Sequence, residues 1–207
     1  ALQRLRDQIG QPVFPVHRID RPTSGVLLFA LSATIARQLA GQFEARLVRK
    51  LYQAIVRGHP PASKLWNEPL VEKRDRIADK KATLDKPAQP AVTKLLTLRS
   101  WTVPFSTGKY PASRYSLINA MPMTGRKHQL RRHLNHMAFP ILGDTTYGDR
   151  RHNRLFRETF GVDRLLLMAM QLKLSHPVTG TPVIIEAKED ADFRTAINEL
   201  SKHDMNN

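Results

Sequence analysis

The sequence contains no cysteine among its 207 residues. Disulfide bonds, thiolate nucleophiles and zinc sites built on thiolates are therefore excluded. No apolar run is long enough to cross a bilayer, because the longest, GVLLFAL and LLLMAM, have the length of a buried strand. The first residues, ALQRLRDQIGQ, do not have the pattern of a secretory signal. We therefore expect a cytoplasmic protein that does not enter a membrane.

Acidic residues are few, with 18 Asp and Glu against 33 Lys and Arg, for a formal net charge of +15. A charge of this size predicts a polyanionic partner, and the alternative is a generally basic protein without one. We favour a nucleic acid because the cations are clustered. One cluster surrounds residues 126–132, and a second comprises Arg150, Arg151, Arg154 and Arg157.

Several catalytic signatures are missing. Neither the G-x-x-x-x-G-K-[ST] nor the G-x-G-x-x-G phosphate-binding pattern occurs. His128, His133 and His136 lie close together, but H-E-x-x-H is absent and no carboxylate is near His128, so we expect no metal. Histidines on an RNA-facing helix explain this cluster equally well. Ser24 lacks a nucleophile-elbow pattern, and Asp20 has no acidic neighbour in sequence to complete a glycosidase pair.

Hydrophobic periodicity predicts interspersed strands and helices without regular βαβ alternation. Strands are expected at residues 26–31, 51–58, 114–120, 164–174 and 182–187, and helices at 33–47 after an N-cap at Ser32, from near residue 127, and at 190–201. Residues 59–112 are rich in proline and charge, so we expect a surface excursion there with one short strand near 92–98. The pattern favours an α+β fold with a mixed or mainly antiparallel sheet and flanking helices.

The stretch HRIDRPTSG, residues 17–25, places the carboxylate of Asp20 between two arginines and ahead of an apolar run. Two interpretations are open. Asp20 forms a surface ion pair of little energetic value, or it is a nucleophile that neighbouring guanidinium groups keep ionised. In the second case the turn at Gly25 would hold Asp20 at the edge of the sheet, where a substrate can reach it.

Four motifs in this order resemble those of the RluA-type pseudouridine synthases. They are HRIDRPTSGVLLFALS, RKLYQAIVRG, TGRKHQLRRHL followed by PILGD, and RLLLMAMQLKLSHPVTG, and they span residues 16–180. The resemblance implies the pseudouridine synthase fold. It also implies an enzyme that breaks the N-glycosidic bond of a uridine, turns the base and rejoins it through C5, with no cofactor or metal.

The resemblance also assigns residues to this reaction. Asp20 is expected to be the catalytic carboxylate, which attacks C1′ of the ribose, attacks C6 of the base, or removes a proton from C2′. Arg131 is expected to pair with Asp20, and Tyr52 to lie against the target base and to help remove the C5 proton. From the residues alone, Tyr52 also fits a core position and Arg131 fits a phosphate contact.

The stretches KPAQPAVT and STGKYPASRY are similar to family members that modify tRNA. This implies a uridine of the acceptor or T-stem region, at position 65 of tRNA, as the target. A ribosomal-RNA enzyme of the same family and a non-catalytic RNA-binding domain are the alternatives. We expect RNA contacts from Arg18, Arg126, Lys127 and Arg132.

Residues 1–207 are expected to form one catalytic domain and a monomer. This domain is shorter at its N-terminus than the family, in which a strand and an N-K-P-x-G turn precede the aspartate motif.

Overall fold

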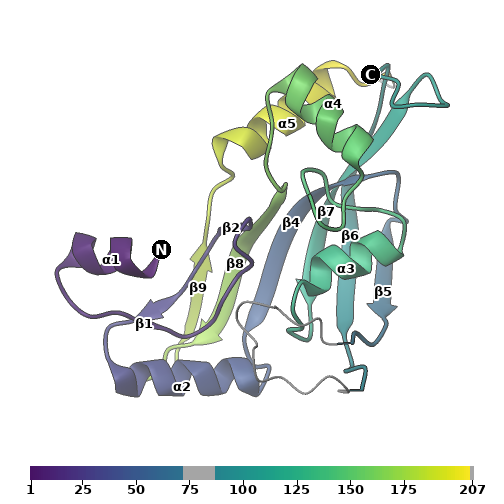
Figure 1. Cartoon of the computed structure of the whole chain (residues 1–207). Coiled ribbons are helices and arrows are strands. Elements are labelled where there is room, and N and C mark those ends of the chain that lie inside the picture. Colours follow the sequence, from purple (N-terminus) through teal and green to yellow (C-terminus); the bar gives the residue numbers. More distant parts are fainter. Residues whose placement is uncertain (72–86, 206–207) are drawn as a thin grey trace.

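The computed structural model of this protein describes residues 1–71 and 87–205. Strand β4 (Arg49–Arg57) lies inside its large sheet (Figure 1). The sheet has seven strands in the order β2-β8-β4-β7-β6-β5, and β9 pairs with β8 beside this path. Only β2 and β8 run parallel, and the other neighbours are antiparallel. The predicted α+β fold with a mainly antiparallel sheet is confirmed.

The strands and helices around β4 have these bounds: β2 Ser24–Gly25, β5 Ser63–Asn67, β6 Val92–Val103, β7 Ser113–Pro122, α3 Gln129–His136, α4 Arg150–Phe160, β8 Leu167–Ser175, β9 Pro182–Glu186 and α5 Ala191–Lys202. Alternate residues of β4 point to opposite faces, as the two-residue period of a strand requires. Ala54 and Val56 pack with Leu134 of α3. Ile55 packs with Phe156 of α4 and Phe193 of α5. The sheet therefore has a helix-covered core on each face.

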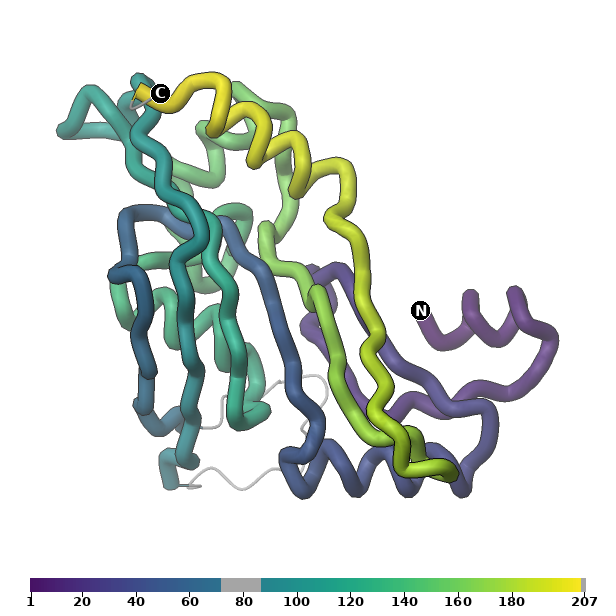
Figure 2. The backbone as a smooth tube through the Cα atoms, turned by 180° about the vertical axis from the view of Figure 1, so that it is seen from behind, coloured from purple at the N-terminus to yellow at the C-terminus, as the bar shows by residue number. Residues whose placement is uncertain are grey.

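The N-terminal part of the chain forms a smaller unit at one end of the sheet. It contains α1 (Leu2–Ile9), β1 (Phe14–Pro15), β3 (Phe29–Ala30) and α2 (Ala33–Glu44). β1 and β3 form a separate two-stranded sheet, and α2 packs through Leu39 against Leu172 and Leu174 of β8. Seen from behind, α2 and the α4–α5 pair lie at opposite ends of the large sheet (Figure 2).

The prediction of a continuous strand at residues 26–31 was wrong. The segment instead passes from β2 of the large sheet to β3 of the small one. The Val26 N–H still donates to the Ala169 carbonyl of β8, whereas the Leu28 N–H donates to Nε2 of His17. The apolar side chains of this segment are buried against the large sheet, which gave them a strand-like pattern. Such a pattern does not reveal which partner the backbone N–H groups bond to.

Two other boundaries differ from the prediction. The helix expected at 33–47 begins at the Ser32 N-cap but ends at Glu44, because Arg46 has a left-handed backbone (φ 59°) and Leu47 is exposed. Residues 59–112 are not only a surface excursion, since they supply β5 and the twelve-residue β6 to the sheet. Part of this range, 72–86, lies outside the described residues.

The remaining predicted elements are present, with shifts of a few residues at their ends. The strand expected at 51–58 is β4, that at 114–120 is β7, and those at 164–174 and 182–187 are β8 and β9. The helix expected from near residue 127 is α3, and the closing helix is α5. Within residues 1–71 and 87–205, none of the helices has the length and apolar character needed to span a bilayer.

Gly25 allows the loop that carries Asp20 to lie directly on β8. Its φ is +101°, and a Cβ at this position would stand 2.1 Å from the Ala169 carbonyl oxygen. Ser24, the preceding residue, donates from its hydroxyl to Asp190, which caps the N-terminus of α5. The start of β2 is thereby fixed to both β8 and α5.

His17 holds the other side of the same loop. Its Nε2 accepts the Leu28 N–H at 2.9 Å, so the ring proton is on Nδ1, and its ring stacks on Phe43 of α2 with centroids 4.7 Å apart. Burial lowers the pKa of His17 to about 4, and the charge of Lys50 contributes in the same direction. His17 is therefore neutral in the folded protein at neutral pH.

We expect Gly25→Ala to lower the free energy of unfolding by at least about 3 kcal/mol, because it combines left-handed strain with a backbone clash. Gly10→Ala is the matched control. Gly10 also has a left-handed backbone (φ +67°), but a Cβ added there would meet no atom within 4 Å, so a loss of about 1 kcal/mol is expected. Urea midpoints at constant m-value measure both. Equal losses would show that contact with β8 does not constrain Gly25.

His17 should make stability pH-dependent between about 4 and 6.5. Its folded pKa lies below its ordinary value, so the unfolded chain binds a proton first as the pH falls, and stability is lost from 6.5 downwards. His17→Gln keeps an acceptor but does not titrate in this range. The difference in unfolding free energy between wild type and His17→Gln should therefore shrink from pH 7 to pH 4.5. A difference that stays constant would contradict a neutral His17.

Candidate active site

Asp20 lies in the turn directly before β2. Its carbonyl accepts the Thr23 N–H at 2.9 Å, which closes a turn over Arg21 and Pro22. The side chain of Asp20 remains 23 % exposed. A carboxylate that is fixed in place and still accessible meets the geometric requirement for direct attack on a substrate.

Arg131 of α3 is buried and is held by a residue that the sequence did not single out. Its Nε and Nη2 donate to the two carboxylate oxygens of Asp144, at 2.7 and 2.8 Å. The backbone N–H groups of Thr146 and Tyr147 also donate to Asp144. These contacts outweigh burial, which alone would raise the pKa of Asp144, and the net direction is downward. Asp144 therefore remains a carboxylate.

The predicted pair between Arg131 and Asp20 is present, but its distance is longer than those of the hydrogen bonds from Arg131 to Asp144. Nη1 of Arg131 lies 3.5 Å from Oδ2 of Asp20. Burial lowers the pKa of Arg131, but the hydrogen bonds and charge of Asp144, with a smaller contribution from Asp20, reverse this and raise it overall. The three residues form a chain of charges from the buried Asp144 through Arg131 to the accessible Asp20.

Tyr52 of β4 lines the same pocket as Asp20. It pairs with Ala120 of β7 and with Ala169 of β8, and a register shift in the ladder to β8 falls between Leu51 and Tyr52. Burial raises the pKa of Tyr52 to about 12, and the negative charge of Asp20 acts in the same direction. At neutral pH Tyr52 is a neutral phenol.

The sequence did not assign two further residues to this pocket. His128 has its Nδ1 3.1 Å from the Tyr147 hydroxyl and its Nε2 3.8 Å from Asp20, and burial lowers its pKa although Asp20 opposes this. Burial also lowers the pKa of Lys50, whose Nζ donates to the Thr124 carbonyl. Both residues lie within quoted motifs, but only the fold shows that they line the pocket around Asp20.

A pocket of about 610 Å³ surrounds Asp20 and Tyr52. Its lining carries five Lys and Arg side chains against two acids: Arg18, Arg46, Lys50, Arg126 and Lys127, with Asp20 and Glu44. Three of the four cations predicted to contact RNA are therefore at this pocket. The volume suits a nucleotide-sized ligand, and the positive lining suits a phosphate.

Arg132, the fourth predicted contact, lies elsewhere. Its side chain is buried, with the residue 5 % exposed, and Nη1 donates to the Val71 carbonyl at 2.9 Å. The preceding residue, Arg131, points the other way and contacts Asp20. A buried guanidinium bonded to the backbone is not open to a phosphate, so Arg132 does not join the pocket rim.

Two of the three neighbouring histidines share Glu68 as a partner, and the third does not. His133 contacts the Thr93 hydroxyl and the Glu68 carbonyl, and His136 contacts the Glu68 carboxylate, whereas His128 faces the Asp20 pocket. Across residues 1–71 and 87–205, no group of three His or carboxylate side chains is arranged to hold a metal. The second arginine cluster lies exposed along α4.

A family described as RNA pseudouridylate synthase matches residues 1–136 of the chain. A tRNA pseudouridine synthase C of Salmonella typhimurium is 52 % identical over 200 residues, which cover 97 % of this chain and 77 % of that protein. The enzyme of that name from Vibrio cholerae is 50 % identical, with 97 % and 82 % covered. A third, from Pectobacterium carotovorum, is 48 % identical over 97 % of this chain, which spans only 53 % of that protein.

Solved structures agree with the sequence comparisons. Human RNA pseudouridylate synthase domain containing 4 is 28 % identical, with a TM-score of 0.70 over 97 % of this chain and 80 % of that one. Human RNA pseudouridylate synthase domain containing 1 shares the fold, with 24 % identity and a TM-score of 0.71 over 96 % and 84 %. The RluA-type resemblance of the motifs is confirmed, and the chain belongs to the RNA pseudouridylate synthase family.

Proposed function

We propose that this protein is an isomerase that converts a uridine of tRNA to pseudouridine, with Asp20 as its catalytic carboxylate. The observation that carries the proposal is the chain of charges from Asp144 through Arg131 to Asp20, which ends in a basic pocket beside Tyr52. Family membership and the tRNA-modifying relatives at about half identity support the substrate class.

In this reaction the N1–C1′ bond of the uridine breaks and a C5–C1′ bond forms. C5 loses its proton and N1 ends with one. The three candidate steps for Asp20, at C1′, at C6 or at the C2′ proton, all need an ionised carboxylate at a fixed place. Arg131 supplies the fixed place, because its third nitrogen reaches Asp20 while the other two are locked on Asp144.

Tyr52 has a narrower role in this proposal than the sequence suggested. Removal of the C5 proton by Tyr52 would need its phenolate, which a pKa of about 12 disfavours at neutral pH. We assign Tyr52 to packing against the flipped base, where a neutral ring can stack. The cations Arg18, Arg126 and Lys127 are assigned to the phosphates on either side of that base.

The target within tRNA follows from the resemblance to tRNA pseudouridine synthase C. We propose a uridine of the acceptor or T-stem region, at position 65, and an enzyme that works in the cytoplasm without cofactor or metal. One domain over residues 1–207 and a monomeric state stay predictions. A ribosomal-RNA substrate and a non-catalytic RNA-binding role are the competing functions.

The experiment that tests this function measures tritium release from tRNA and ribosomal-RNA transcripts labelled at C5 of uridine, because the reaction expels the C5 proton. We expect release from tRNA and loss of at least about a thousandfold in rate for Asp20→Asn. Asp163→Asn changes an exposed acid outside the pocket and is the matched control. Release from ribosomal RNA alone would reassign the substrate, and tRNA binding without release would support the non-catalytic role.

Arg131→Lys should lower kcat by at least about tenfold, or 1.4 kcal/mol, although it keeps the charge. Arg131 uses three nitrogens to join Asp144 to Asp20, and Lys has only one. Single-turnover kinetics with saturating enzyme measure the effect, and circular dichroism checks that the variant is folded. Arg37→Lys, on the exposed face of α2, is the control. A wild-type rate in Arg131→Lys would remove Arg131 from the catalytic machinery.

A further inference from the structure

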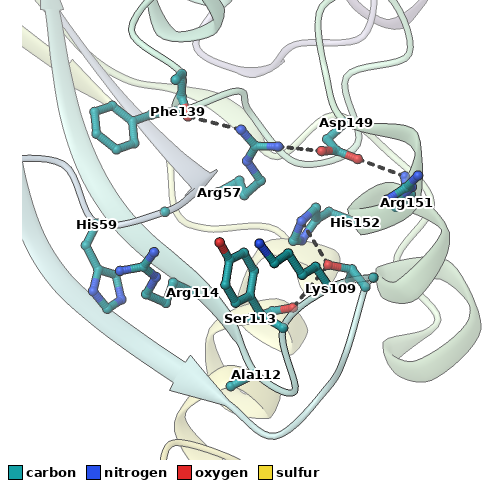
Figure 3. A pocket seen from close by; sticks show the side chains of 15 residues that line it. Arg57, His59, Lys109, Ala112, Ser113, Arg114, Phe139, Asp149, Arg151 and His152 are labelled. Atoms are coloured by element: carbon teal, nitrogen blue, oxygen red, sulfur yellow. Dashed lines mark hydrogen bonds and ion pairs between the residues drawn. The ribbon is translucent and has the colours of Figure 1, made fainter.

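A second basic pocket lies away from Asp20, where β4 ends and α4 begins. Its volume is about 510 Å³. It is lined from separate stretches of chain (Figure 3): residues 57–59 at the end of β4, residues 107–114 before and at the start of β7, Ala138 and Phe139 after α3, and Asp149, Arg151 and His152 at the start of α4. Arg57 is five residues from Tyr52 along β4, which corresponds to roughly 16 Å. The two pockets are therefore distinct sites on one strand.

The charge in this second pocket is only partly compensated. Asp149 is the one acid in the lining, and it pairs with Arg57 and accepts the Arg151 N–H at the start of α4. Lys109, Arg114 and Arg151 are exposed, and within the described part of the chain none of them forms an ion pair with a carboxylate. Three cations around one cavity repel one another, and a bound anion would relieve this repulsion.

An aromatic side chain beside these cations indicates the kind of anion. Tyr110 is 66 % exposed, and Nζ of Lys109 lies 5.7 Å from its ring centroid. An exposed ring next to cations is the pattern by which proteins hold unpaired nucleotides, with a base stacked on the ring and phosphates on the charges. A free phosphate would use the cations but would leave Tyr110 without a role.

The second pocket lies between the Asp20 site and the exposed arginines of α4 along the chain. The segment 144–149 joins the two sites, because Asp144 holds Arg131 at one end and Asp149 holds Arg57 at the other. On the far side, α4 carries Arg150, Arg154 and Arg157 exposed to solvent. One polynucleotide strand could follow this path.

We propose that this pocket is a second RNA subsite, which binds the phosphodiester backbone through Lys109, Arg114 and Arg151 and stacks an unpaired base on Tyr110. The inference rests on the proposed function, since the RNA is the same substrate whose target uridine enters the Asp20 pocket. The subsite contributes affinity and orientation and takes no part in the chemical step.

The test measures binding of a tRNA transcript against salt, with every substitution made in the Asp20→Asn background so that turnover does not enter. Arg114→Ala and Arg151→Ala should each weaken binding roughly three- to tenfold near 0.1 M salt and lower the log–log salt slope by about one unit. Arg37→Ala, on α2 at the opposite end of the sheet, is the matched control. Losses no larger than in Arg37→Ala would overturn the proposal.

The role of Tyr110 is tested separately. Tyr110→Ala should weaken tRNA binding at least about fivefold without changing the salt slope, and Tyr110→Phe should restore it, because stacking needs the ring and not the hydroxyl. A Tyr110→Ala variant that binds tRNA as tightly as the Asp20→Asn background does would overturn the stacking assignment.

Titration with uridine monophosphate and with inorganic phosphate tests whether the pocket binds a small ligand instead of RNA. Micromolar binding of either one that is lost in Arg114→Ala would overturn the RNA assignment.

Failure of the subsite and failure of the proposed function give different results. In the otherwise wild-type protein, Arg114→Ala should raise KM for tRNA more than it lowers kcat. If tritium release is normal and binding is unaffected by the substitutions, the subsite is wrong and the isomerase stands. If no release occurs on any RNA but binding and salt slope still respond, the isomerase is wrong and the subsite stands.

Discussion

The bidentate pair between Arg131 and Asp144 is the interaction on which the geometry of the candidate site depends. Both side chains are almost fully buried, at 5 % and 1 % exposure. Removing one partner of such a pair leaves an uncompensated buried charge, which typically costs about 3–5 kcal/mol. The fork geometry also fixes the orientation of the guanidinium, so that its third nitrogen points to Asp20. The buried pair of Arg131 and Asp144 therefore helps to fix the position of the accessible Asp20 carboxylate.

The sheet brings the parts of the site together from distant segments. Asp20 precedes β2, Tyr52 lies on β4, and Arg131 lies on α3, while β8 contacts both β2 and β4. The close approach of Gly25 to Ala169 and the acceptor role of His17 hold the Asp20 loop on this frame. The short segment after Asp144 then carries the chain to Asp149 and the second basic pocket. The groups of the candidate site and the second pocket thus share one framework.

The sequence was informative where a residue and its role are local. The motifs identified Asp20, Tyr52 and Arg131, which the fold brings to one place, and periodicity found most of the strands and helices. Asp144 was missed because its importance comes from burial against Arg131, thirteen residues earlier, and burial of an acid has no pattern in sequence. Arg132, for which an RNA contact was predicted, lies apart from the Asp20 pocket because α3 turns successive arginines to different surroundings. The length of β6 was underestimated because proline and charge nearby suggested an irregular segment.

The parallel pairing of β2 with β8 affects how the protein folds while it is being synthesised. Ser24 pairs with Met168, 144 residues later in the chain, and Ser24 also bonds to Asp190. At about 5–20 residues per second, a ribosome makes this partner strand roughly 7 to 30 seconds after the aspartate loop. Contacts of such long range form late in folding. A nascent chain therefore contains Asp20 well before β8 has been made, so the loop that carries Asp20 gains its support only after Tyr52 and Arg131, the other residues of the candidate site, are already part of the chain.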